Sequence, residues 1–250
     1  MLSLKGVGRA AMKRLLLLSN STNFGEPFLR HSIGPIRQFL GLAASEALFV
    51  PYAAVRVSYS DYAARVRERF AEIGISLASV HEAEDPAEAV EKAAVIVVGG
   101  GNTFCLLDRL YRHGLVERIR QRVLHGVPYV GWSAGSNVAC PTIKTTNDMP
   151  IVEPPSLDAL ALVPFQINPH YTDATLPNHG GETRAERLLE FVEANPGASV
   201  IGLREGTLLR IEGETIELQG DKPARVFRKG QEAAEFAPGA SLRRLFEESG

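Results

Sequence analysis

Ser133 is the residue of this chain whose surroundings suggest chemistry most clearly. It is the centre of the pentapeptide Gly131-Trp132-Ser133-Ala134-Gly135, which directly follows the apolar run 127–130. A serine hydroxyl is a weak nucleophile at neutral pH unless a base accepts its proton and hydrogen-bond donors stabilise the oxyanion. A G-x-S-x-G sequence between a strand and a helix meets part of this need, because its sharp turn exposes the serine and its glycines avoid clashes. The pentapeptide alone fits a plain glycine-rich turn equally well.

A base for this serine would come from the histidines that follow it, His170 and His179. His170 follows Pro169 in a predicted loop rather than on an apolar face, so we interpret it as catalytic rather than as a core residue. His179 lies in a Pro-Asn-His-Gly-Gly loop and is interpreted as a turn or rim residue. A metal site built from His170, Asp173 and His179 would lack the usual helical spacing, and we expect no metal and no cofactor.

Two carboxylates could orient the histidine and stabilise its charged form. Asp148 lies in the sequence Asn147-Asp148-Met149-Pro150, and Glu205 precedes Gly206. Each is expected in a loop near a strand end, and each could equally be a solvated turn residue. The residues themselves leave both acids open.

A second glycine cluster, Gly99-Gly100-Gly101, follows the apolar run 95–98 and precedes Asn102 at the start of a predicted helix. A phosphate-binding loop is one interpretation, but the chain has neither G-x-x-x-x-G-K-[ST] nor G-x-G-x-x-G at this place. We favour the other interpretation, in which this loop supplies a backbone amide to an oxyanion hole near Ser133.

The elements that position these residues follow an alternating pattern. Strand-like apolar runs are predicted at 15–18, 47–50, 75–80, 94–98 and 127–131, with helices at 62–73, 102–112 and after the N-cap residue Asp85. Continuously apolar strands that alternate with helices predict a largely parallel sheet covered by helices on both faces. The loops around Gly101 and Ser133 both follow strands, so they should meet at the carboxyl edge of this sheet.

The second half of the chain has a different pattern. A strand at 165–168 and a helix at 182–193 precede short strands at 199–203, 207–211, 215–218 and 224–228, which are separated by glycine turns. We predict C-terminal β-hairpins that close one side of the sheet.

Composition restricts the class of protein. The chain has 250 residues, 45% of them hydrophobic, and a formal net charge of −2. We therefore expect a single α/β domain over residues 1–250, with residues 1–11 as a loose extension and no nucleic-acid or membrane partner. The two cysteines, Cys105 and Cys140, fit small buried side chains in a reducing compartment, and we expect a cytoplasmic protein.

Several segments together resemble the peptidase E family of α-aspartyl dipeptidases. They occur in order between about Met12 and Gly230, and they are 15–21, 99–104, 131–135, 139–143, 145–150, 167–171, 180–184 and 200–206. The resemblance implies a serine peptidase with a fold similar to class I glutamine amidotransferases, acting on Asp-X dipeptides through an acyl-enzyme.

Roles for individual residues follow from the same resemblance. It implies Ser133 as nucleophile, His170 as base and Glu205 as orienting acid, with Asp148 as the alternative acid. The amides of Gly101 and Ala134 would form the oxyanion hole. Arg184 would bind the aspartyl side chain, since a guanidinium matches a carboxylate, and Asn102 would be a further substrate-binding residue.

Two other functions remain as alternatives. One is a cyanophycinase-like hydrolase of β-aspartyl peptides, which the intact segments 145–150 and 181–184 disfavour. The other is a non-catalytic binding module, which the presence of Ser133, His170 and both acids disfavours. The order serine, histidine, acid argues against a lipase or esterase. Oligomeric state is left open, with a homodimer as one option.

Overall fold

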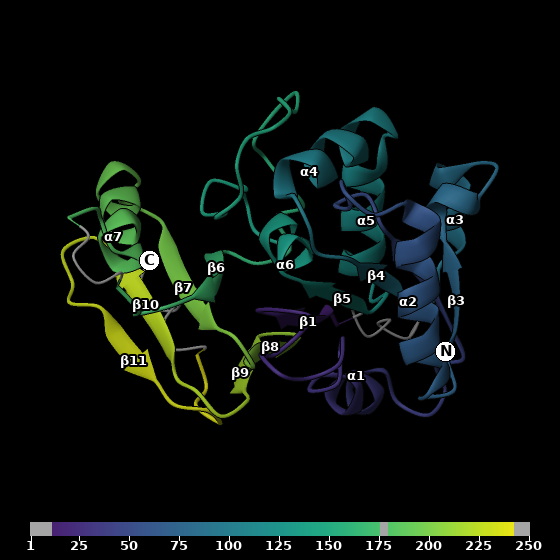
Figure 1. The fold of residues 1–250 in the computed structure, drawn as a ribbon, viewed down its shortest axis with the longest axis horizontal. Helices are drawn as coiled ribbons and strands as arrows, with labels where there is room; N and C mark the ends of the chain where they lie inside the picture. The colour runs from purple at the N-terminus through teal and green to yellow at the C-terminus, as the bar shows by residue number, and fades with distance from the viewer. Residues whose placement is uncertain (1–11, 176–179, 243–250) are drawn as a thin grey trace, which may run out of the picture.

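The computed structural model describes residues 12–175 and 180–242 and contains two β-sheets (Figure 1). The expected loose extension at residues 1–11 and the residue His179 lie outside the described residues. The larger sheet has the strand order β3-β2-β4-β5-β1-β8-β9. Its strands are β1 (Arg14–Leu18), β2 (Glu46–Val50), β3 (Ser76–Ser79), β4 (Ile96–Val98), β5 (Tyr129–Trp132), β8 (Leu208–Glu212) and β9 (Thr215–Gln219).

Five neighbouring strands of this sheet, from β3 to β1, are parallel, and β8 and β9 add an antiparallel hairpin beside β1. The carboxyl ends of β1, β2, β4 and β5 therefore lie next to one another at one edge. The predicted parallel sheet and its C-terminal hairpin are confirmed.

Helices cover both faces of the larger sheet because its strands are apolar on both sides. Leu16 and Leu18 of β1 pack with α1 (Ile33–Leu40) and α2 (Tyr59–Ala71). Leu15 and Leu17 contribute to the opposite core. That core includes side chains of α3 (Pro86–Lys92), α4 (Thr103–Arg112), α5 (Leu115–Leu124) and α6 (Ala134–Val138). In Figure 1, α1 lies below the sheet, and α4, α5 and α6 lie above it.

The smaller sheet has the strand order β11-β10-β7-β6. Its strands are β6 (Gln166–Tyr171), β7 (Ser199–Arg204), β10 (Ala224–Arg228) and β11 (Ala234–Phe236), and α7 (Arg184–Ala194) packs on one face. The expectation that all late strands close one side of a single sheet is wrong for β7 and β10. These two strands pair with each other in the smaller sheet. The prediction failed because the apolar pattern of a strand indicates which face is buried but not which strand is its neighbour.

Local signals set several helix starts, that of α3 as expected. The Asp85 carboxylate accepts hydrogen bonds from the backbone of Ala87 and Glu88 and caps α3. The helix expected at 182–193 begins two residues later, as α7, where Thr183 and Glu186 form a capping box that was not predicted from the sequence. The predicted strand at 75–80 ends one residue early, in a short 3₁₀ helix, η1 (Val80–Glu82). Over residues 12–175 and 180–242, no helix combines the length and the apolar character needed to cross a bilayer.

Candidate active site

Ser133 lies at a strained turn between β5 and α6. Its backbone has φ 52° and ψ −112°, a conformation that L-residues rarely adopt. A Cβ on Gly131 would lie 2.6 Å from the carbonyl oxygen of Gly135, and one on Gly135 would lie 2.2 Å from the carbonyl oxygen of Val98. Both positions therefore require glycine for close packing, which is the physical reason for the G-x-S-x-G pattern.

His170 is the described histidine that reaches Ser133, with 3.0 Å between its Nε2 and the serine Oγ. The structure places it within β6 rather than in the predicted loop, so that expectation is wrong. The register of β6 against β7 shifts between Asn168 and Tyr171, and His170 has φ 53°. This irregularity turns the imidazole toward the serine.

Glu205 contacts the other side of the imidazole, with 2.7 Å between its Oε1 and the Nδ1 of His170. An ionised carboxylate can only accept a hydrogen bond, so Nδ1 carries the proton and Nε2 is left to accept the hydroxyl hydrogen of Ser133. The side chains of His170 and Glu205 are 40% and 46% exposed, so solvent reaches this pair.

Asp148, the alternative acid, is engaged elsewhere. Its Oδ2 accepts hydrogen bonds from the amide and hydroxyl of Thr103, at 2.7 and 2.6 Å, and from the hydroxyl of Thr146 at 3.1 Å. The carboxylate therefore ties the loop before β6 to the first residue of α4.

Two segments could supply oxyanion donors. Ala134 is the first residue of α6, and the first amides of a helix lack acceptors within it. Gly101 has φ 140°, and a Cβ there would lie 2.2 Å from the carbonyl oxygen of Ala53, so only glycine fits. The hydroxyl of Tyr62 donates to the carbonyl of Gly100 and fixes this loop.

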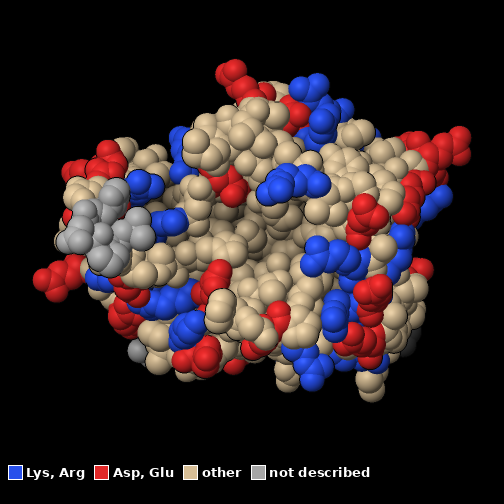
Figure 2. All heavy atoms as spheres, in the orientation of Figure 1, with Lys and Arg blue, Asp and Glu red and all other residues tan. Residues whose placement is uncertain are grey.

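Ser133 and His170 open into a cleft of about 700 Å³. Its walls come from the loops after four neighbouring parallel strands, which contribute Ser21, Ala53, Gly101, Asn102 and Ser133 among others. Figure 2 shows this face hollowed near its middle, with both basic and acidic side chains at the rim. The side chain of Asn102 lines the cleft while capping α4 through Cys105 and donating to the carbonyl of Met149.

Arg184 lies in a neighbouring cavity of about 470 Å³, which shares Asp148 and no other lining residue with the main cleft. Arg184 is half-buried, and burial, with the nearby Arg187 adding to it, lowers its pKa from the ordinary value. Among residues 12–175 and 180–242, no carboxylate lies within ion-pair distance of its guanidinium. This site therefore favours an anion from outside the chain.

Other nucleophiles and ligands fit the structure less well. Cys140 is fully buried, and burial raises the pKa of its thiol to about 12. Within the described part of the chain, no group of three or more His, Cys, Asp or Glu side chains is placed to hold a metal ion. Of the three residues considered as metal ligands, Asp173 is paired with Arg204 and Arg225, and His179 lies outside the described residues.

The sequence interpretation missed two buried polar residues that follow β1. The hydroxyl of Ser19 accepts a hydrogen bond from the amide of His170 at 2.9 Å and donates to the carbonyl of Leu203 at 2.8 Å. The side-chain oxygen of Asn20 accepts from the amide of Gly206, directly after Glu205. Two polar residues directly after the four leucines of β1 were the available signal.

Comparisons with known proteins agree with this geometry. The sequence model described as peptidase family S51 matches residues 15–219. A peptidase E from Nostoc sp. is 51% identical over 94% of this chain and 97% of its own length, and one from Streptomyces coelicolor is 50% identical over 94% and 96%. The crystal structure of a peptidase from an acI-B1 Actinobacterium superposes with a TM-score of 0.69, at 19% identity, over 93% of this chain and 98% of that one.

Proposed function

The chain belongs to peptidase family S51 and is a serine-type peptidase, and we propose that it hydrolyses dipeptides with an N-terminal α-linked aspartate. The observation that carries the proposal is the hydrogen-bonded row from Ser133 through His170 to Glu205. The resemblance in the segments around these residues supports the same roles.

In the proposed reaction, the Oγ of Ser133 attacks the carbonyl carbon of the aspartyl residue and its proton passes to Nε2 of His170. The amides of Gly101 and Ala134 stabilise the oxyanion. The C–N bond then breaks, and His170 gives the proton to the leaving amine. Water, activated by His170, hydrolyses the remaining ester and releases aspartate.

Arg184 supplies the proposed selectivity for aspartate. Its guanidinium has no carboxylate partner among residues 12–175 and 180–242, and it lines the cavity that shares Asp148 with the cleft, so the aspartyl side chain is proposed to enter this cavity. Asn-X has nearly the same shape but cannot neutralise the guanidinium, and Glu-X displaces the scissile carbonyl by one methylene. Leaving a buried charge unpaired costs about 2–5 kcal/mol, and because Arg184 is only half-buried we expect the lower end, about 30-fold in kcat/KM.

The test measures kcat/KM of the wild type for Asp-Leu, Asn-Leu, Glu-Leu and β-Asp-Leu. We expect Asp-Leu to be the best substrate by about 30-fold or more. Arg184→Ala should lower the rate on Asp-Leu and narrow the gap to Asn-Leu. Arg118→Ala, which removes an exposed arginine of α5 that lines neither cavity, should keep the gap.

Ser133→Ala is the background control, since loss of a serine nucleophile costs about 10⁶-fold in kcat. An Arg184→Ala enzyme with the wild-type preference for Asp-Leu would assign selectivity to another residue. A wild type that prefers β-Asp-Leu would replace the proposal with β-aspartyl hydrolysis.

A further inference from the structure

Two arginines line the cleft of Ser133 and have no assigned role in the proposed reaction. They are Arg56, in the loop after β2, and Arg65, on α2. Over residues 12–175 and 180–242, no carboxylate lies within ion-pair distance of either guanidinium. Unpaired cations in a substrate cleft favour an anionic group of the substrate.

Arg65 is held in place by a series of aromatic contacts. Its guanidinium carbon lies 4.9 Å from the centre of the Phe28 ring. Phe28 in turn packs edge-on against Trp132, with 6.3 Å between ring centres, and Trp132 directly precedes Ser133. Arg65 is itself exposed, so this contact restrains its guanidinium at the wall of the cleft without enclosing it.

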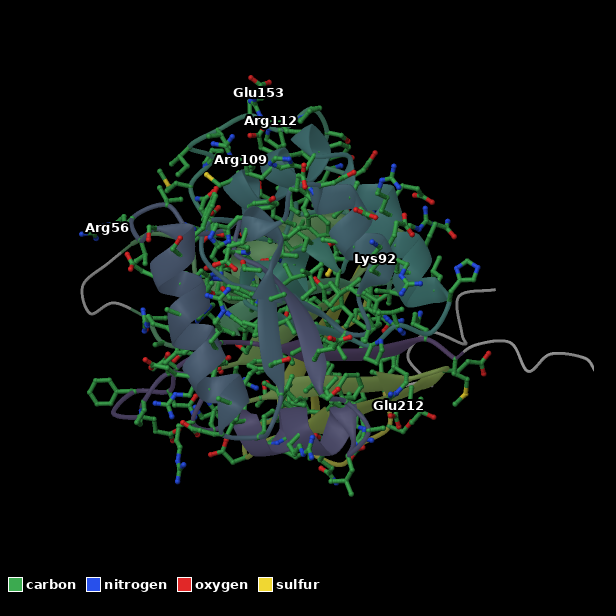
Figure 3. All side chains as sticks on the ribbon, turned by 90° about the vertical axis from the view of Figure 1, so that its right-hand side faces the viewer. Arg56, Lys92, Arg109, Arg112, Glu153 and Glu212 are labelled. Carbon is green, nitrogen blue, oxygen red and sulfur yellow. The ribbon has the colours of Figure 1, made fainter. Side chains whose placement is uncertain are left out.

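Arg56 differs from Arg65 in its orientation. Figure 3 shows the Arg56 side chain extended away from the body of the molecule into solvent. It would raise the local positive potential, but no aromatic ring or carboxylate in the described part of the chain fixes it. Of the two, Arg65 is the one placed for a directed hydrogen bond.

The same cleft has an apolar wall beside these arginines. Val55, Val57 and Ile151 line it and are 56%, 43% and 54% exposed. Large apolar side chains that remain exposed inside a cleft favour an apolar group of the ligand. An arginine next to such a wall suits an amino acid with a free carboxylate and an apolar side chain.

We propose that Arg65 binds the C-terminal carboxylate of the dipeptide and that Val55, Val57 and Ile151 receive the side chain of its leaving residue. This inference rests on the proposed dipeptidase function and adds the second half of the substrate. Consecutive residues are about 3.8 Å apart, so in a dipeptide the free carboxylate lies immediately beyond the scissile bond. A longer peptide has a neutral amide at that place, and Arg65 therefore selects for dipeptides.

The experiment compares Asp-Leu with its C-terminal amide, which lacks the carboxylate and is otherwise the same. The wild type should prefer the free acid by about 10- to 100-fold in kcat/KM, the range expected for a hydrogen bond to a charged group. Arg65→Gln should lower kcat/KM for Asp-Leu by this same factor and leave kcat/KM for the amide nearly unchanged. Arg65→Lys should retain part of the preference.

Arg69→Gln is the matched control. It removes the same charge one turn further along α2, from an arginine that pairs with Glu72 and does not line the cleft. Its ratio of acid to amide should equal that of the wild type. The wild type should also cleave Asp-Leu faster than Asp-Ser, as the apolar wall predicts.

Three results would overturn the inference. The first is a wild-type ratio of acid to amide kcat/KM near one, and the second is an Arg65→Gln enzyme that keeps the wild-type ratio. The third is an Arg65→Gln enzyme whose kcat/KM falls equally for Asp-Leu and for its amide. Equal rates on Asp-Leu and Asp-Ser would show that Val55, Val57 and Ile151 do not bind the side chain of the leaving residue. If the enzyme instead prefers β-Asp-Leu, the proposed function fails, and the same ratio measured on β-Asp-Leu and its amide still tests Arg65.

Discussion

Ser133 and His170 share an unusual backbone geometry. Both have positive φ, and within residues 12–175 and 180–242 the other non-glycine residues with this property are Leu29 and Ala161. Such conformations cost about 1–3 kcal/mol each and persist only where the surrounding structure fixes them. Here they are fixed where the two side chains meet, so the strain accompanies a geometry that serves proton transfer.

The two candidate acids can be separated by isosteric substitutions. Glu205→Gln removes the charge next to His170, so the imidazole loses control of its tautomer and its charged form loses a counter-ion. We expect kcat to fall by about 10²- to 10⁴-fold, toward the lower end because Glu205 is half-exposed. Asp148→Asn should reduce kcat less than about tenfold, because its Oδ2 binds threonines rather than His170. Steady-state rates on Asp-Leu for both variants decide between them.

Melting temperatures measured alongside separate a catalytic effect from the loss of the tie between Asp148 and Thr103. A nearly silent Glu205→Gln beside a severely impaired Asp148→Asn of wild-type stability would exchange the two assignments.

At the scale of elements, the turn that carries Ser133 could be predicted from sequence because its causes are local. Gly131 is required by a contact with the backbone oxygen of Gly135, four residues later, and a strand followed by a helix sets the rest. The same holds for the start of α3, where Asp85 caps the next residues. Features of this kind can be predicted from a few neighbouring residues. Gly135, by contrast, is required by a contact with Val98 of β4, which the pentapeptide does not reveal.

The elements that deliver His170 could not be predicted in the same way. The irregularity in β6 depends on its pairing with β7, more than 30 residues later, and no local residue marks it. The choice of β10 rather than β8 as a partner for β7 is likewise made by packing. The sequence interpretation named Ser133, His170 and Glu205, which the structure brings together, and missed the smaller sheet that positions two of them.

The smaller sheet has an ion-pair cluster that makes its stability depend on pH. The carboxylate of Asp173, after β6, contacts Arg204 at 2.6 Å and Arg225 at 3.2 Å, and Glu235 of β11 contacts Arg204 at 2.8 Å. Burial alone would raise the pKa of Asp173, but hydrogen bonds from Arg204, Tyr171 and Arg225 outweigh it and hold the pKa below its ordinary value of 3.8. A depressed pKa means that the charged form stabilises the fold.

This contribution should be present above pH 3.8 and disappear as the pH falls through the lower pKa of the folded state. Asp173→Asn should therefore lower the free energy of unfolding at pH 7, by about 1 kcal/mol or less because the carboxylate is half-exposed. The difference from wild type should shrink toward zero as the pH falls below 3.8 and through the lower pKa of the folded state. Urea unfolding at pH 7 and over a series of acidic pH values checks this, with the exposed Asp221→Asn as control. A difference that persists unchanged in acid would mean that packing, and not charge, is responsible.

At the scale of the whole molecule, the hydrogen-bonded row from Ser133 through His170 to Glu205 joins the two sheets. Ser133 follows β5 of the larger sheet, whereas His170 and Glu205 belong to β6 and to the turn after β7 in the smaller one. Their relative position therefore depends on how the sheets are held together. One apolar core contains residues of both sheets, among them Leu17, Ile167 and Ile201, and supplies the general alignment. Apolar contacts alone do not fix an imidazole to within a few tenths of an ångström.

Ser19 and Asn20 supply that precision at the end of β1. The hydroxyl of Ser19 bridges His170 of β6 and Leu203 of β7, and Asn20 holds the amide that follows Glu205. Both side chains are buried, so their hydrogen bonds do not compete with water. We expect Ser19 to act as a positioning residue for the base.

Ser19→Ala tests this expectation. Without this acceptor, the partly buried amide of His170 loses its hydrogen bond, and the strained backbone at this residue can relax. A shift of about 1 Å in a catalytic group can cost about 100-fold, so we expect kcat on Asp-Leu to fall by about 10- to 100-fold with KM nearly unchanged. Ser79→Ala is a matched control, because Ser79 is equally buried at the end of β3 and far along the sheet from β1. Both variants should lose about 1 kcal/mol of stability, but only Ser19→Ala should lose kcat. If the two variants keep the same kcat, or if Ser19→Ala changes KM instead, the alignment of His170 does not depend on Ser19 and must come from the apolar core between the sheets.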